Sequence, residues 1–128
     1  MCSSDLGLTH GLAYASDGKP RAGMGIASGD IFGDGGEAVI VTNLPTESFT
    51  MFQRQPNGEF VDATEQSGIS HISLPYSGFG VGLFDMENRG LLDFFSANGA
   101  VAAMATEQYV LAGCLQHGLP LRGASRCG

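Results

Sequence analysis

Two stretches of the chain share one pattern that decides its fold: GIASGDIFGDGGEAVIVTN, residues 25–43, and GVGLFDMENRGLLDFFSANG, residues 80–99. In each, a Gly-rich segment leads into an acidic turn, and the turn leads into a short apolar run that ends at Asn. The stretches align without a gap, with Asp30 matching Asp85 at an offset of 85 − 30 = 55. A repeat of about 50 residues with strand–loop–strand content predicts propeller blades or a β-solenoid.

Composition favours one small domain with many tight turns. The 128 residues include 20 glycines, without the period of three that collagen requires. A formal net charge of −7 repels phosphate backbones, so the sequence disfavours a nucleic-acid partner. No apolar run approaches the roughly 20 residues of a membrane-spanning helix, so we expect no membrane insertion.

The local pattern predicts one four-stranded unit and the start of another. Expected strands cover residues 24–28, 39–42, 49–54 and 60–63 in the first unit, and residues 77–84 and 94–97 in the second. A leading hairpin is expected from Leu12–Tyr14 and the chain after Arg21, around an Asp17-Gly18 turn. Residues 64–68 predict a helical turn closed by Gly68. The third and fourth strands of the second unit are not recognisable.

Both ends of the chain differ from the repeats. MCSSDL, residues 1–6, lacks the basic and apolar regions of a signal peptide. It matches the translation of a common sequencing adapter, so we expect an artefact there. Strand alternation stops near residue 101, and residues 101–128 are expected to be a frame-shifted or chimeric tail. Its Ala-rich part, residues 101–112, favours a short C-terminal helix by propensity.

Three segments, in this order, resemble the VCBS/FG-GAP repeats of ASPIC/UnbV-type proteins, which include the cartilage acidic protein family: AGMGIASGDIFGDGGEAVIVTN, SFTMFQRQPNGEFVDATEQSGI and LPYSGFGVGLFDMENRGLLDFFSANGAV. The resemblance implies an all-β fold, a β-propeller of four-stranded blades in an extracellular or periplasmic protein. It also implies Ca²⁺ in the Asp-rich loop between the first two strands of a blade. The chain would hold about one and a half blades of a truncated propeller: residues 11–68 with the leading hairpin, and residues 69–100.

Each acidic loop carries part of a calcium ligand set. Ca²⁺ takes six to eight oxygen ligands, which carboxylates at positions one, three, five and nine of such a loop can supply. In the first loop, Asp30 and Asp34 hold positions one and five, and Phe32 and Ala38 occupy three and nine. Glu37 lies one residue early and can substitute only if the loop shifts. The alternative for this loop is ordinary turn chemistry.

In the second loop, Asp85, Glu87 and Asp93 hold positions one, three and nine. Position five is Arg89, whose guanidinium competes with a cation and can pair with the carboxylates. The alternative to calcium here is an internally neutralised cluster of salt bridges.

Other kinds of site find little support in the sequence. An EF-hand needs Glu at position twelve of its loop, where this chain has Val41 and Ser96. No Gly-Lys-Ser/Thr follows the glycines, and no serine lies in a nucleophile elbow. The sequence therefore favours a non-enzymatic structural or interaction module with a protein or glycan partner. The alternative is a scaffold portion of a propeller enzyme whose catalytic residues lie outside this fragment.

An incomplete propeller also has a predicted physical weakness. Blades bury their strands against neighbouring blades, and repeat arrays need about three units for stability. We therefore expect Val39–Val41 and Phe94-Phe95 to leave apolar faces and open strand edges exposed, and the isolated chain to be marginal or prone to aggregate.

Overall fold

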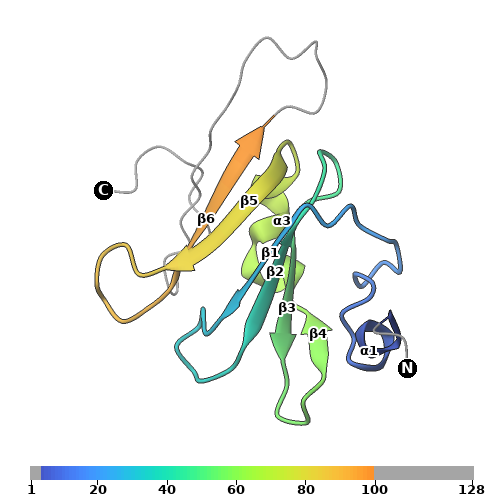
Figure 1. Ribbon diagram of the computed structural model, residues 1–128, viewed down its shortest axis with the longest axis horizontal. Helices are drawn as coiled ribbons and strands as arrows, with labels where there is room; N and C mark the ends of the chain where they lie inside the picture. The colour runs from blue at the N-terminus through green and yellow to red at the C-terminus, as the bar shows by residue number, and fades with distance from the viewer. Residues whose placement is uncertain (1–3, 100–128) are drawn as a thin grey trace.

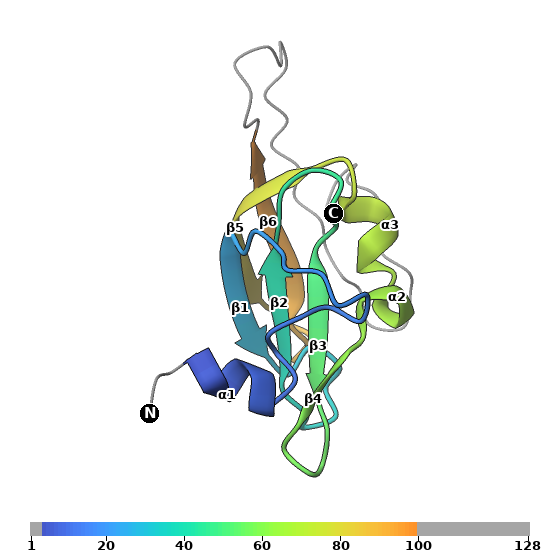
Figure 2. The same ribbon diagram turned by 90° about the vertical axis from the view of Figure 1, so that its right-hand side faces the viewer.

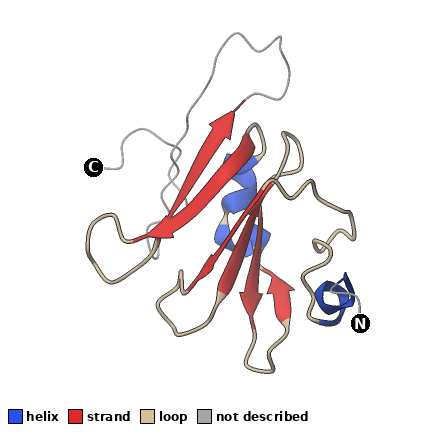
Figure 3. Ribbon diagram, viewed as in Figure 1, coloured by secondary structure: helices blue, strands red, loops and turns tan. Residues whose placement is uncertain are grey.

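The computed structural model describes residues 4–99 and shows a chain built mainly from antiparallel strands with a few short helices (Figures 1 and 3). The elements are α1 (Ser4–Thr9), β1 (Gly25–Gly29), β2 (Ala38–Thr42), β3 (Thr50–Arg54), β4 (Phe60–Asp62), α2 (Thr64–Ser67), α3 (Ile69–Ser73), β5 (Ser77–Phe84) and β6 (Asp93–Gly99). Neither sheet of the described residues closes on itself. The all-β class is thus confirmed in its coarse form.

Sheet A contains β1 to β4 in chain order, each strand antiparallel to the next. Its centre is β2, whose run of β-branched residues suits a buried strand, and Ala38 and Ile40 are fully buried there. The four expected strands match those observed to within one or two residues. At the end of β2, the buried Asn43 side chain donates to the carbonyl of Ser48 and accepts from the N–H of Gly23, so it ties both neighbouring segments to the sheet.

Sheet B contains β5 and β6, and its register repeats that of sheet A. Five consecutive pairs join β1 to β2, from Gly25 with Thr42 to Gly29 with Ala38. Each pair has a counterpart shifted by 55 residues in both strands, from Gly80 with Ala97 to Phe84 with Asp93. The repeat seen in the sequence is therefore also a repeat of strand pairing.

The core lies between the two sheets. Figure 2 shows sheet B behind β1 and β2, with α2 and α3 beside β3. The rings of Phe49 and Phe94 meet edge to face at 6.2 Å, and Val81 and Leu83 pack against the same cluster. The expectation that Val39, Ile40 and Phe94 would be exposed is wrong, because all three are buried. Ile40 and Phe94 lie in the cluster between the sheets, whereas Val39 is buried on the opposite face of sheet A.

The linker after β4 forms two helices where the sequence predicted one turn. Gly68 ends α2 in the left-handed conformation, at φ 75°, as expected. The second helix, α3, has low intrinsic propensity and is held by tertiary contacts. Ile69 is fully buried, and the Ser73 hydroxyl accepts a hydrogen bond from the N–H of Phe49.

The leading hairpin is not formed, and the structure has no strand between α1 and β1. The predicted turn exists, since the N–H of Gly18 bonds to the carbonyl of Ala15. The flanking backbone groups have other partners: the carbonyl of His10 accepts from Phe60, and the N–H of Ser16 donates to Asp62. His10 and Ser16, at the two ends of this segment, are therefore hydrogen-bonded to β4, and Leu12 and Ala13 between them donate to the carbonyl of Gly7.

The expected tail and C-terminal helix, residues 101–128, lie outside the described residues, as do residues 1–3 of MCSSDL; its last three residues begin α1. Within residues 4–99, no helix has the length and apolar character needed to cross a bilayer.

Candidate functional site

The β1–β2 loop (residues 30–38), called loop I, is organised by the Asp30 side chain. Its Oδ1 accepts hydrogen bonds from the N–H groups of Gly33 (2.7 Å) and Asp34 (3.2 Å). Its Oδ2 accepts from Gly35 at 2.9 Å. Asp34 in turn accepts from the N–H of Gly36 at 2.8 Å. Both carboxylates therefore serve as internal acceptors that fold the loop, as Asp side chains do in Asx-turns.

The β5–β6 loop (residues 85–93), called loop II, uses the equivalent carboxylate in the same way. Asp85 accepts from the N–H of Arg89 at 2.8 Å and from that of Gly90 at 2.5 Å. The hydrogen bond from Arg89 is the largest influence on the pKa of Asp85 and holds it below its ordinary value. The acceptor pattern, to residues four and five positions ahead, is the one that Asp30 makes.

Backbone conformation confirms that the two loops are equivalent. Gly35 and Gly90 both have φ of 81°. Two positions earlier, Gly33 has φ 69° and Asn88 has φ 52°, so Asn takes the left-handed conformation that glycine takes in loop I. The loops also lie against each other, since a Cβ at Gly33 would be 2.7 Å from Leu91 Cδ2. They extend from the same end of the two sheets (Figure 1).

Arg89 occupies the centre of the acidic cluster in loop II. Its Nε lies 2.9 Å from Glu87 Oε2, and its Nη2 lies 2.9 Å from Asp93 Oδ1. The Asp93 side chain is only 3% exposed, and its other oxygen accepts from the N–H of Met86 at 3.0 Å. A buried carboxylate requires such a partner. The guanidinium thus takes the place between carboxylates that a cation would take.

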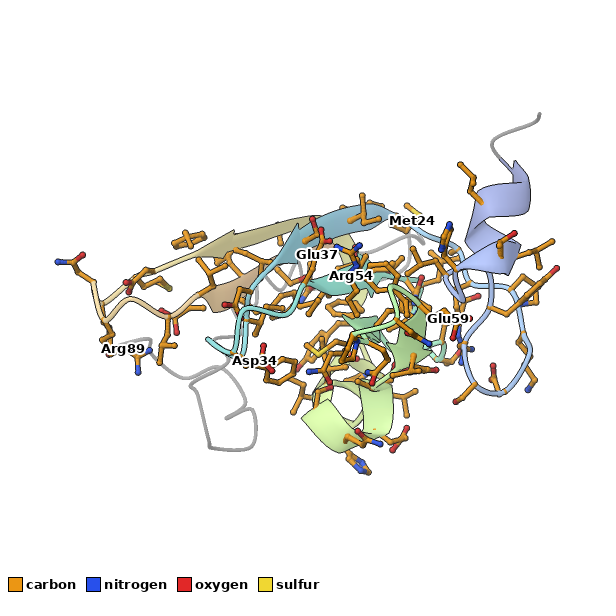
Figure 4. The ribbon with its side chains drawn as sticks, turned by 90° about the horizontal axis from the view of Figure 1, so that it is seen from below. Met24, Asp34, Glu37, Arg54, Glu59 and Arg89 are labelled. Carbon is orange, nitrogen blue, oxygen red and sulfur yellow. The ribbon has the colours of Figure 1, made fainter. Side chains whose placement is uncertain are left out.

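In the observed arrangement, the acidic side chains of both loops have partners other than a metal ion. In loop I, Glu37 Oε2 lies 3.9 Å from Arg54 Nη1, and Figure 4 shows Glu37 beside Arg54 and apart from Asp34. In residues 4–99, no three His, Cys, Asp or Glu side chains are grouped so as to hold a metal. Calcium binding at Asp30, Asp34, Glu37, Asp85, Glu87 and Asp93 stays a prediction, and at loop II it requires Arg89 to leave the cluster.

The structure reveals a cleft that the sequence did not predict. It lies between loop I and the β3–β4 turn and has a volume of about 560 Å³. The lining residues are Asp34, Gly35, Gly36, Glu37, Gln53, Arg54, Gln55, Pro56 and Gly58. Figure 4 shows Glu37 and Arg54 close together, whereas Arg89 lies at the tip of loop II. Arg54 is the last residue of β3 and reaches Glu37 only through the pairing of strands, so no local sequence signal identifies it.

Comparisons with protein-family models, curated proteins and solved structures found no match for this chain.

Proposed function

We propose that this chain is a structural and interaction module of an extracellular FG-GAP/VCBS-type β-propeller, in which sheet A is one blade and sheet B is the inner half of the next. The observation that carries the proposal is the offset of 55 residues, which holds through five strand pairs and the hydrogen bonds of both loops. Sheets that repeat and stack face to face are what a propeller requires.

The stacking is supported by glycines at the contact between sheets. A Cβ at Gly78 would lie 2.6 Å from Phe49 Cζ, and one at Gly25 would lie 3.3 Å from the carbonyl oxygen of Phe79. Such spacing leaves no room for a side chain, so the backbones of successive units approach closely. This matches the close inner strands of neighbouring blades, where small residues are needed.

The partner surface in this proposal is the cleft beside loop I. Its carboxylates, amides and the Arg54 guanidinium offer donors and acceptors on a solvent-facing edge. This chemistry suits the hydroxyl-rich surface of a glycan or the polar rim of a protein. Loop I is held in place by Asp30, so the cleft is preformed on one side.

A glycan array, with purified extracellular-matrix proteins added, tests the proposal. We expect a ligand that binds the native chain and loses at least tenfold in affinity, about 1.4 kcal/mol, with Arg54→Ala. Leu74→Lys, at an exposed position after α3, is the control and should bind as the native chain does. The absence of any binding, or binding that Arg54→Ala leaves unchanged, would count against this function for the cleft.

A further inference from the structure

The two faces of sheet A have different environments. One face, called the glycine face, carries Gly25, Ala27 and Gly29 and lies under sheet B. A Cβ at Gly25 would be 3.3 Å from Val81 Cγ1, and one at Gly29 would be 3.3 Å from Leu83 Cδ1. Sheet B packs so closely on this face that a side chain at either glycine would crowd it, which accounts for glycine at these positions.

Register places Gly80, Gly82 and Phe84 of sheet B at the positions of Gly25, Ala27 and Gly29, on the face that points away from sheet A. Ala97, the partner of Gly80, lies on the same face. This surface is called the outer glycine face. Within the described chain, a Cβ at Gly80 would meet Ala97 Cβ at an ordinary 3.5 Å, and one at Gly82 would come no nearer than 3.7 Å to the Phe84 ring. Neither glycine has a positive φ.

Gly80 and Gly82 therefore have no conformational or packing requirement within residues 4–99. Glycine inside a strand weakens it relative to alanine, and it often marks a close approach by another backbone. In sheet A, the equivalent glycine does face such a backbone. The presence of Gly80 and Gly82 on the outer glycine face therefore indicates that another strand unit, of the kind that covers sheet A, packs on this face.

The surface that could cover this face is present elsewhere on the chain. The opposite side of sheet A, called the Ile26 face, carries Ile26, Ser28 and Val41 at the positions of Val81, Leu83 and Ser96. Val81 and Leu83 pack into the core, but Ile26 is 70% exposed on an edge strand. Val39, which pairs with Ser28 on this face, is buried, as is its neighbour Phe52, so the exposed part of the Ile26 face is its β1 edge. This edge and the outer glycine face are equivalent to the two surfaces that meet between sheet B and sheet A.

We propose that a second copy of this chain seats its Ile26 face on the outer glycine face of sheet B, and so continues the sheet A–sheet B interface from one molecule into the next. The two surfaces differ, so the contact is heterologous and leaves one free face of each kind at the ends of the assembly. Burial of Ile26 and of the 44% exposed Phe84 drives the contact. The inference rests on the blade-like stacking of the proposed function, but not on its glycan or protein partner.

Sedimentation velocity over a wide concentration range, with the full chain, tests this inference. The native chain should show a mass that rises with concentration beyond the dimer. Ile26→Lys blocks one face, and Gly82→Lys blocks the other, where a Cβ has room. Each variant alone should remain monomeric, and an equimolar mixture should form a dimer and nothing larger, because each variant keeps one intact face. Leu74→Lys is the matched control and should associate as the native chain does.

Circular dichroism establishes that each variant is folded, and Ala97→Lys replaces Gly82→Lys if the latter is not. A native chain that is monomeric at every concentration overturns the inference, as do variants that still associate alone or that fail to recombine. Binding of a partner at the cleft would survive such a result. The failure of this inference and the failure of the proposed function are therefore distinguishable.

Discussion

Asp30 and Asp85 hold their loops by the same two hydrogen bonds, each accepting from the N–H groups four and five residues ahead. The loops differ in most other side chains, so this shared pattern is what defines their shape. A carboxylate that satisfies several backbone donors acts like a helix cap and is worth a similar free energy. Loop order then depends on Asp30 and Asp85 without any need for a metal ion.

Asp30→Ala should lower the free energy of unfolding by about 1–2 kcal/mol, because three backbone N–H groups lose their acceptor. Urea denaturation in EDTA measures this loss. Asp34→Ala is the control, since its Oδ1 accepts from Gly36 alone in the loop, and its effect should be smaller. If the Asp30→Ala loss appeared only when calcium was present, a metal and not the hydrogen bonds would organise the loop.

Arg89→Asp should create or strengthen calcium binding at loop II. The change removes the cation that neutralises Glu87 and Asp93, and it supplies a carboxylate at position five. We expect calorimetric titration to show at least a tenfold gain in Ca²⁺ affinity over the native chain, about 1.4 kcal/mol.

The control for this experiment adds Asp93→Ala to Arg89→Asp and should abolish the gain. Native chain that already binds Ca²⁺ as tightly as the variant would show that Arg89 does not compete. Native chain with no heat and no thermal shift would overturn the predicted calcium binding.

Strand positions were predictable from the sequence because their signals are local. The bounds expected for the first strand of the second unit, 77–84, are those of β5. Small residues and alternation specify such a strand without help from elsewhere. Helix α3, which the sequence did not predict, is not specified by a local signal. Its sequence ISHIS is a weak helix former, and the helix depends on the burial of Ile69. Tertiary contacts decided its conformation.

In the candidate site, too, the features with a local sequence signal were predicted and those that depend on strand pairing were not. The sequence placed Asp30 and Asp85 correctly at the start of equivalent loops, and it identified Arg89 as a competitor for the carboxylates. It did not predict that Glu37 pairs with Arg54 beside a cleft. That pair joins residues 17 positions apart through the β2–β3 register, which no motif records.

Asp62→Asn should destabilise the chain near neutral pH by about 1 kcal/mol and lose this effect in acid. Partial burial opposes ionisation of Asp62, but hydrogen bonds from Thr64 and Ser16 outweigh it and lower the pKa. A carboxyl with a lowered folded pKa stabilises the fold above its unfolded pKa, and this stabilisation is lost as pH falls through the folded value. Urea denaturation from neutral pH to below 3.8, the ordinary pKa of Asp, measures the difference.

Glu65→Gln, at an exposed carboxylate of α2, is the control for that series and should leave the free energy of unfolding nearly unchanged. A difference between native and Asp62→Asn that stayed constant into acid would show that shape and not charge matters at this position.

Gly78→Ala and Gly80→Ala should have opposite effects, although the two glycines lie two residues apart in β5. A Cβ at Gly78 would lie 2.6 Å from both Phe49 Cζ and Thr42 Cβ, so the sheets must separate, and we expect a loss of about 1–3 kcal/mol. A Cβ at Gly80 has room, so alanine there should stabilise the strand by roughly 0.5 kcal/mol. Urea denaturation at low protein concentration measures both, so that association between copies does not contribute. Gly78→Ala with no loss of stability would mean that sheet B does not pack on sheet A through Gly78, and the stacking on which the propeller proposal depends would fail with it.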